Sequence, residues 1–278
     1  MQLIEFIKAF LIGIVQGITE WLPVSSTGHM ILFQSFLKLE VSDAFWNMFL
    51  VVIQLGSILA VPVLFWERLN PFSAKKSAGE RRATLALWLR VVLAIIPSGI
   101  VGILLDDWFD THLHHAIPVA VALIVYGIVF LFLERLPRRA EQVCSADAVT
   151  AKTALMIGLF QILSLIPGTS RSGSTILGAM LLGLSRTAAA EFSFFMAIPT
   201  MLGAGGIKIL KFIAQGATLT GSEWAILGIG CLTAFAVSLV AIRYLMDYVK
   251  RHSFAVFGVY RIVLGLIVLG TAAAGLIA

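Results

Sequence analysis

The chain has 278 residues, of which 59% are hydrophobic and only 13% are charged, and its mean hydropathy is +0.98. A soluble domain carries roughly a quarter of its residues as charged side chains, so this composition excludes a water-soluble globule. The net charge of +5 does not indicate nucleic-acid binding, because the basic residues stand in short loops between apolar runs. The composition therefore predicts an integral membrane protein.

Six segments are apolar and long enough to cross a hydrocarbon core of about 30 Å as helices. They are 44–66, 86–105, 116–133, 189–210, 224–243 and 254–277. Each run is continuously apolar rather than alternating, which argues against a transmembrane barrel. We therefore predict an all-α, multi-pass membrane protein.

Two other regions, 3–37 and 154–184, are apolar but are interrupted at their centres by Pro, Gly and hydroxyl residues. The interruptions are WLPVSSTGH at 21–29 and LIPGTSRSGST at 165–175. Each half is expected to be too short to span the bilayer. Non-helical backbone survives at membrane depth only where protein or a wet cavity satisfies it. We therefore predict that both regions are re-entrant helix–loop–helix hairpins.

The sequence also repeats itself weakly at an offset of 144, which places Ser26 on Ser170 and the run 47–60 on 191–204. Each unit is one hairpin followed by three spans. Repeat 1 covers about 1–135 and repeat 2 about 150–278 of a single membrane domain. Because three crossings is an odd number, the second unit is expected to be inverted, an arrangement typical of transporters with broken helices at the midplane.

Basic residues collect in alternate loops, which predicts the orientation of the chain. Cytoplasmic loops are enriched in Lys and Arg, so we expect the basic face to be cytoplasmic and both termini to lie outside. The residues on that face are Arg68, Lys75, Lys76, Arg81, Arg82, Arg135, Arg138, Arg139, Lys152, Arg186, Arg243, Lys250 and Arg251, against Lys38, Lys208 and Lys211 opposite. The first hairpin then enters from outside and the second from the cytoplasm. Two other arginines, Arg90 and Arg261, are expected to extend to a membrane interface.

Ionisable side chains at membrane depth cost roughly 2.5–3.5 kcal/mol each on insertion scales, so they are candidate functional residues. The interrupted segments hold Glu20, His29 and Arg171, and Gln16 lies one helical turn before Glu20. If the two hairpins meet tip to tip, these groups converge among hydroxyls. The hydroxyl residues are Ser25, Ser26, Thr27, Ser170, Ser172, Ser174 and Thr175.

This set of residues predicts an anion site. Each returning half-helix begins near its polar loop and turns its free N–H groups and positive dipole end toward the midplane. Arg171 adds a planar donor fork suited to phosphate. Glu20 repels a phosphate unless a divalent cation lies between them. Ser26 and His29 are three residues apart, within reach of each other on one helical turn, so together the residues predict metal-assisted phosphoryl transfer.

Structural interpretations compete with this one. Ser and Thr in membrane helices often only bond backbone or join helices, and Glu20 with Arg171 could be a structural ion pair. Glu191 either supports Arg171 or caps a helix start, and we favour the first.

The motifs then indicate a family. QGITEWLPVSSTGHM at 16–30 and PGTSRSGST at 167–175 resemble the two signature motifs of undecaprenyl-pyrophosphate phosphatases, the bacitracin-resistance family. The resemblance extends through VIQLGSILAV at 52–61 and EFSFFMAIP at 191–199. It implies dephosphorylation of a C55 prenyl pyrophosphate carrier to the monophosphate, at the outer (periplasmic) face of the bacterial plasma membrane. That reaction recycles the carrier for peptidoglycan and other envelope polymers.

The resemblance also implies roles for single residues. Glu20 matches the essential glutamate that acts through Mg²⁺ or Ca²⁺, and Arg171 the essential arginine. Ser26 and His29 match the proposed nucleophile and its partner. The remaining polar positions are Ser170, Ser172 and Thr175, and Ser25 and Thr27 are further candidates for phosphate binding. Gln16 departs from the pattern, which often has Glu there; its carbonyl can still bind a metal but carries no charge.

Two alternatives were compared with this family. The acid-phosphatase-like lipid phosphatases also have PSGH and SR elements, but they need a His where this chain has Leu177, so they are rejected. A prenyl-phosphate flippase would use the same phosphate site and suits an inverted repeat, but it has little use for a nucleophile and a base. Whether Ser26 or His29 attacks phosphorus, which metal acts, the prenyl chain length and a homodimer are left open.

Overall fold

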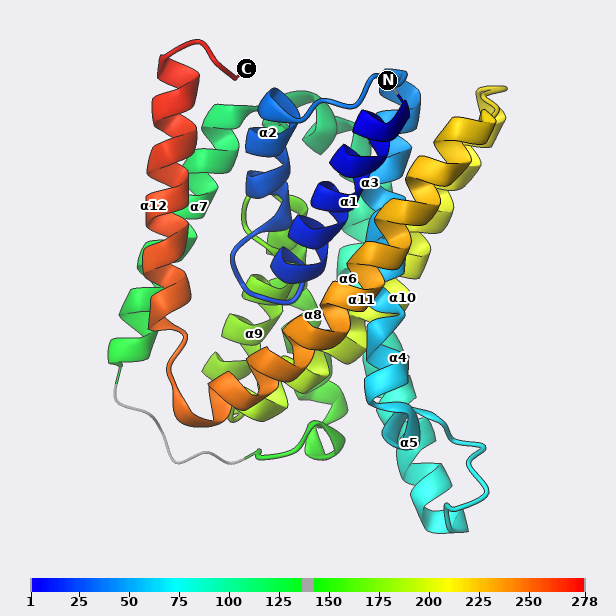
Figure 1. Ribbon diagram of the computed structural model, residues 1–278. Coiled ribbons are helices and arrows are strands. Elements are labelled where there is room, and N and C mark those ends of the chain that lie inside the picture. The colour runs from blue at the N-terminus through cyan, green and yellow to red at the C-terminus, as the bar shows by residue number, and fades with distance from the viewer. Residues whose placement is uncertain (1, 137–142, 278) are drawn as a thin grey trace.

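The computed structural model describes residues 2–136 and 143–277, and the regular elements in these ranges are all helices (Figure 1). The first half forms α1 (Gln2–Thr19), α2 (Ser26–Phe36), α3 (Asp43–Ile58), α4 (Ala60–Leu64), α5 (Trp66–Leu69), α6 (Ala78–Leu113) and α7 (Ala116–Arg135). The second half forms η1 (Ala146–Ala148), α8 (Ala151–Ile162), η2 (Leu163–Leu165), α9 (Arg171–Leu181), α10 (Arg186–Ala214), α11 (Gly221–Arg251) and α12 (Ala255–Ala273). The predicted all-α class is confirmed.

Seven helical segments within the described residues are long and apolar enough to cross a membrane. They are Gln2–Thr19, Asp43–Leu64, Ala78–Leu105, Ala116–Arg135, Arg186–Ala214, Gly221–Arg251 and Ala255–Ala273. The six predicted spans are among them. The span predicted at 44–66 is divided at Leu59 between α3 and α4. Pro62 explains the division, because proline has no N–H to donate to the carbonyl of Ile58 four residues earlier.

The seventh segment corrects the sequence analysis. The half-hairpin 3–19 was expected to be too short, but α1 has 18 residues, or about 27 Å at 1.5 Å per residue. Its two charged residues are accommodated by pairing, since Lys8 Nζ lies 2.7 Å from Glu5 Oε1. The other three halves are short, with 11 residues in α2, 12 in α8 and 11 in α9.

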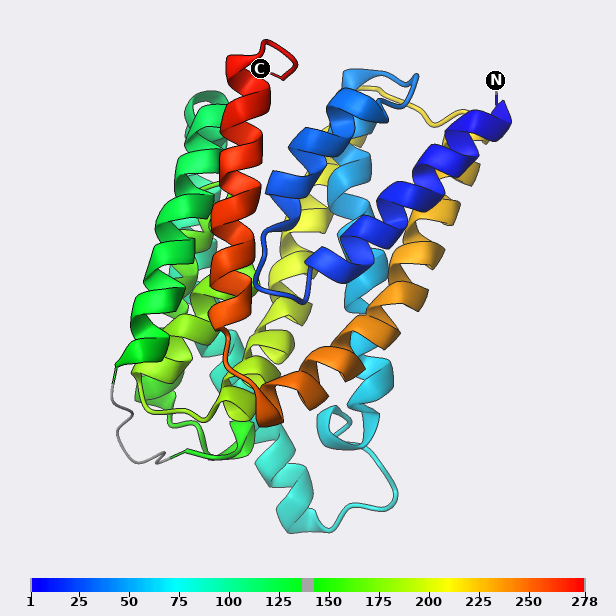
Figure 2. The same ribbon diagram turned by 60° about the vertical axis from the view of Figure 1, so that its left-hand side comes forward.

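Each interrupted region forms a helical hairpin with an irregular tip. Figure 2 shows α1 and α2 descending and returning, with the loop between them in the middle of the bundle. Both returning helices start in the same way. Ser25 and Ser170 each have φ 71°, and each side chain accepts a hydrogen bond from the N–H three residues on, that of Gly28 or Gly173. These caps lie 145 residues apart, so the predicted offset of 144 is wrong by one residue here.

Close helix pairing holds the hairpins in place. α7 packs along α12, α1 along α11, and α6 along α8, while α10 contacts α9 and α2 contacts both α7 and α12. The α7–α12 pair depends on glycine, because a Cβ on Gly127 would stand 2.7 Å from the carbonyl oxygen of Gly258. This close pairing brings the middle of α12 against the tips of both hairpins.

Both termini lie at one end of the bundle, and the α5–α6 connection at the other (Figure 1). The end of α7, the start of α8, the start of α10 and the end of α11 gather at that second end. The basic residues of these segments therefore share one end, as the loop charges predicted. Arg138 and Arg139, also assigned to this face, lie outside the described residues.

Candidate active site

The tips of the two hairpins meet through a buried ion pair. Arg171 Nη2, at the first position of α9, lies 3.2 Å from Glu20 Oε1, in the loop after α1. The two residues are 151 positions apart in sequence, and their side chains are only 10% and 5% exposed. The predicted convergence of the two polar loops is thus found in the structure.

Glu20 has two more polar neighbours from its own hairpin. Gln16 Nε2 donates to Glu20 Oε2 at 2.9 Å, as the one-turn spacing on α1 predicted. The Ser26 hydroxyl also interacts with the Glu20 carboxyl group. One carboxylate therefore gathers an arginine, an amide and a hydroxyl at the start of α2.

Arg171 is held by two further groups. Its Nη1 donates to the backbone carbonyl of Ser193 on α10 at 2.9 Å, and its guanidinium lies 6.0 Å from the centre of the buried Trp21 ring. Ser193 was not singled out from the sequence, although it lies in the EFSFFMAIP motif. The Arg171 guanidinium is thus held by two separate segments, the loop after α1 and helix α10.

The predicted phosphate-binding hydroxyls already have protein partners. Ser172 Oγ donates to the carbonyls of Glu20 and Leu22 at 3.3 and 3.4 Å, which ties α9 to the first loop. Thr175 Oγ1 lies 2.6 Å from Ser193 Oγ. Ser25 and Ser170 cap their helices, and Ser170 Oγ is 3.1 Å from Ser172 Oγ. Thr27 is half-buried on the first turn of α2.

His29 lies on α2 but does not pair with Ser26. Its Nδ1 is 2.7 Å from the backbone carbonyl of Ser25, and its Nε2 is 2.6 Å from the hydroxyl of Tyr260 on α12. The predicted contact between Ser26 and His29 is therefore replaced by two other contacts. His29 is 8% exposed, so it is buried between the start of α2 and Tyr260.

Comparison with known proteins agrees with the motifs. Residues 9–267 match the family model described as bacitracin resistance protein BacA. The chain belongs to this family. It is 58% identical over 268 residues to "Undecaprenyl-diphosphatase 1" of Clostridioides difficile (strain 630), covering 96% of each chain.

Two further relatives carry the same kind of name. "Undecaprenyl-diphosphatase" of Streptococcus equi subsp. zooepidemicus (strain MGCS10565) is 56% identical over 266 residues, covering 95% of each chain. That of Streptococcus thermophilus (strain ATCC BAA-250 / LMG 18311) is 55% identical over 268 residues, covering 96% of this chain and 93% of the relative. The three names describe a diphosphatase and none describes a transporter. With the seven apolar helices, family membership makes this chain a multi-pass membrane protein.

Arg261 of this BacA-family chain is placed differently from the prediction. It was expected to extend to a membrane interface, but it is 0% exposed. Its Nη1 donates to the carbonyl of Pro23 at 3.2 Å and its Nη2 to that of Gly168 at 2.8 Å, one in each hairpin loop. The prediction failed because these loop carbonyls meet the guanidinium in the middle of the bundle, so the side chain need not reach water.

Glu191 also differs from the prediction. Its Oε2 accepts from Arg68 Nη1 at 2.6 Å, and the same guanidinium reaches Asp147 Oδ2 at 2.6 Å. Glu191 therefore joins α10 to α5 and η1 and is not the support of Arg171. Helix geometry gives the reason, because residues two apart on a helix point about 200° apart and Ser193 is the one that faces Arg171.

The residues at the hairpin tips were compared with the ligands that a divalent cation needs. The described residues contain no group of three His, Cys, Asp or Glu side chains that could hold a metal by themselves. The site offers the Glu20 carboxylate and the carbonyl oxygen of Gln16, whose Nε2 is used by Glu20. Mg²⁺ is commonly held by one or two carboxylates plus substrate phosphates, so these residues fit a cation shared with a phosphate.

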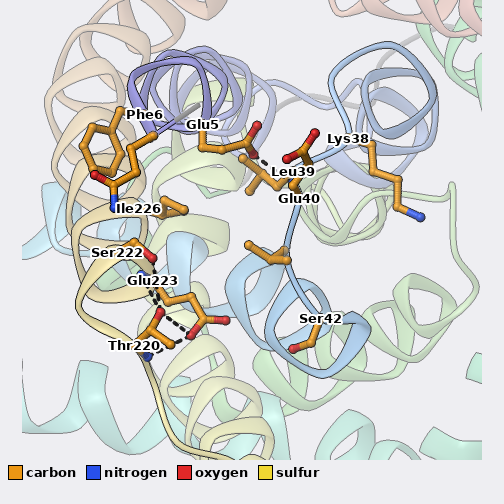
Figure 3. Close-up of a pocket in the computed structure, with 12 residues that line it drawn as sticks. Glu5, Phe6, Lys38, Leu39, Glu40, Ser42, Thr220, Ser222, Glu223 and Ile226 are labelled. Atoms are coloured by element: carbon orange, nitrogen blue, oxygen red, sulfur yellow. Dashed lines mark hydrogen bonds between the residues drawn. The ribbon is translucent and has the colours of Figure 1, made fainter.

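A large pocket of ≈ 830 Å³ lies away from this site, between the start of α1, the α2–α3 connection and the start of α11 (Figure 3). Two of its carboxylates, those of Glu5 and Glu223, have structural partners. Glu5 Oε2 accepts from the N–H of Glu40 at 2.8 Å, and Glu223 closes a capping box with Thr220. None of the predicted site residues lines this pocket, so we assign the chemistry to the hairpin tips.

Proposed function

We propose that this protein hydrolyses undecaprenyl diphosphate to undecaprenyl phosphate and inorganic phosphate, and so supports bacitracin resistance. The observation that carries the proposal is the buried Glu20–Arg171 pair, which joins the two motif-bearing loops. In the reaction, the bond between the terminal phosphorus and the bridging oxygen breaks. The bridging oxygen leaves on undecaprenyl phosphate, and water supplies the oxygen that completes inorganic phosphate.

The place where the two hairpin tips meet, at Glu20 and Arg171, is called the junction. Two features of the junction suit the negative charge that develops on the transferred phosphate. Arg171 presents a planar donor fork, which matches phosphate oxygens better than a lysine ammonium. The N-termini of α2 and α9 both start at the junction, at Ser26 and Arg171. Helix N-termini favour anions through their free N–H groups and dipole. The terminal phosphate is therefore expected to bind between these two helix starts.

Ser26 and His29 are the two proposed nucleophiles, and each has its own partner. Ser26 adjoins Glu20, which can take the proton of the hydroxyl. The partner of His29 is Tyr260, whose hydroxyl lies 2.6 Å from His29 Nε2. Because these partners differ, the two side chains are proposed to act separately, one attacking phosphorus and the other handling a proton.

A divalent cation, Mg²⁺ or Ca²⁺, is proposed to act with the substrate, held by Glu20 and Gln16. Such an ion neutralises phosphate charge, which a carboxylate alone would repel. Within the chain itself, Glu20 keeps Arg171 directed at the junction, and Gln16 orients the carboxylate.

Glu20→Gln is expected to lose most phosphate release and to respond weakly to added Mg²⁺, because the amide lacks the charge that binds the cation. Phosphate release by purified protein over a range of Mg²⁺ concentrations checks this, with Glu191→Gln as the matched control outside the site. Full turnover of the wild type in excess chelator would contradict the cation role of Glu20.

The function itself is tested by phosphate release from undecaprenyl diphosphate by the purified wild-type protein in detergent or liposomes. Release of one phosphate per substrate, with undecaprenyl phosphate as the lipid product, is the expected result. A protein that moves the lipid across a liposome bilayer and releases no phosphate would instead be a flippase.

The arrangement is proposed to be an inverted repeat, with both hairpins re-entrant and the site open to the outer face of the bacterial plasma membrane. The two units, about 1–135 and 150–278, share one order of elements, a hairpin followed by three long helices. Buried Gln16 and Gln161 also lie 145 positions apart, the same interval as the two caps. This agreement supports a common ancestry of the two units.

Topology is predicted with both termini outside and the connection between α5 and α6 in the cytoplasm. In a Cys144→Ser, Cys231→Ser background, an impermeant thiol reagent should label the Ala274→Cys variant in intact spheroplasts. The Lys75→Cys variant should be labelled only after lysis. Both positions are exposed, so access to the reagent differs only by side. The reverse pattern would overturn the orientation.

A further inference from the structure

Tyr260 of α12 contacts His29 from outside the hairpin that carries His29. The two rings stack with their centres 5.6 Å apart and their planes at 12°. The Tyr260 hydroxyl lies 2.6 Å from His29 Nε2. Tyr260 is 46% exposed, whereas His29 is 8% exposed, so the phenol covers the imidazole on the outer side of the bundle.

These contacts determine which nitrogen of His29 carries the proton. A backbone carbonyl only accepts hydrogen bonds, so the 2.7 Å contact with Ser25 O requires the proton of the neutral ring to sit on Nδ1. Nε2 then holds a lone pair, and the Tyr260 O–H donates to it. The groups that face the ring are the Ser25 carbonyl, the Tyr260 phenol and, through its charge, Arg261.

We propose that Tyr260 is a positioning residue: the Ser25 carbonyl sets the tautomer of His29, and the Tyr260 O–H orients the ring through Nε2 and releases that nitrogen when the ring takes part in phosphoryl transfer. This proposal rests on the proposed phosphatase function. In other enzymes a hydrogen bond to a catalytic imidazole sets the orientation of the ring, and ring orientation is the property assigned to Tyr260 here.

The position of Tyr260 on α12 supports this role. Arg261, the next residue, donates to a carbonyl in each hairpin loop, so the backbone of α12 is fixed against the site at this point. The phenol hydroxyl is therefore held where α2 presents His29. Removing the hydroxyl alone leaves the half-exposed ring and its stacking in place, which makes Tyr260→Phe a mild change for the fold.

The test compares Tyr260→Phe with the wild type and with Tyr244→Phe. Tyr244 is an exposed tyrosine on α11 that stacks on Tyr248 and so serves as the matched control. ¹⁵N NMR of histidine-labelled protein, with His29 assigned from a His29→Gln sample, reports the hydrogen bond at Nε2. We expect Tyr260→Phe to shift the His29 Nε2 resonance and to lower kcat about 3- to 10-fold, the effect of one neutral hydrogen bond. KM should stay within about twofold, and Tyr244→Phe should change none of these.

Two results would overturn the proposal. An unchanged His29 resonance in Tyr260→Phe would show that the hydroxyl does not bind Nε2. A shifted resonance with unchanged kcat would show that the contact does not serve the reaction. Both require an active wild type, so they are distinct from failure of the proposed function, which is seen when the wild type releases no phosphate. In that case this proposal falls as well.

Discussion

The Arg171→Ala variant is expected to retain about 10⁻³ to 10⁻⁵ of wild-type turnover. Arginines that stabilise a transferred phosphoryl group are worth about 10³–10⁵ in rate in other phosphoryl-transfer sites. Arg171 lies where both loops meet and its side chain is 10% exposed, so water in the variant cannot readily replace the interactions of the guanidinium with the phosphate. Arg171→Lys should recover only part of the rate, because an ammonium keeps the charge but not the planar fork. Steady-state phosphate release measures both variants.

A loss of turnover could also follow from unfolding, because Arg171→Ala leaves the Glu20 carboxylate buried without its cation. Arg186→Ala is the matched control. Arg186 pairs with buried Glu134 at 2.6 Å and so tests removal of a similar ion pair away from the site. Both variants are compared by thermal unfolding in detergent. If Arg171→Ala turns over at wild-type rate, or if Arg186→Ala loses as much turnover at equal stability, Arg171 has no special role in catalysis.

Composition and apolar run length predicted the helical membrane fold because the bilayer leaves few alternatives. Every spanning backbone must satisfy its own hydrogen bonds, so long apolar runs become helices. The exact ends were less predictable. α1 incorporates Glu5 and Lys8 because the two side chains pair, and apolar counting alone does not show such pairing.

The meeting of Glu20 with Arg171 was predictable from the two interrupted, polar loops, since isolated charges at membrane depth need partners. The contacts that depend on packing between helices distant in sequence were not predictable. His29 binds Tyr260, 231 positions away, rather than the nearby Ser26. Glu191 and Ser193 are two residues apart, and only the rotation of α10 decides which of them faces Arg171.

Arg261 was missed although the rule that selected Arg171 applied to it equally. It lies well inside an apolar helix, where an ionisable residue is a functional candidate. Its partners are backbone carbonyls, which carry no sequence signal. Burial of the guanidinium therefore became visible only in three dimensions.

Arg261→Leu is expected to destabilise the protein by roughly 2–6 kcal/mol and to abolish most activity. The variant leaves the carbonyls of Pro23 and Gly168 buried without their donors, and each such loss costs about 1–3 kcal/mol. The two loops that carry Glu20 and Arg171 then lose the side chain that binds both of them. Arg261→Lys should have a stability and an activity between those of the wild type and Arg261→Leu. One ammonium cannot reproduce a guanidinium that donates to two separate carbonyls.

Chemical unfolding in detergent, followed beside phosphate release, separates the two effects of Arg261. Arg90→Leu is the control, since Arg90 also donates to a backbone carbonyl, that of Asp147, but in an exposed contact; surface changes of this kind stay within about 0.5 kcal/mol. Wild-type stability in Arg261→Leu would contradict the tie between the loops. A variant that was stable but inactive would indicate that Arg261 acts on the substrate directly. Loss of the hydrogen bonds to Pro23 and Gly168 is expected to lower stability, so it would not explain that result.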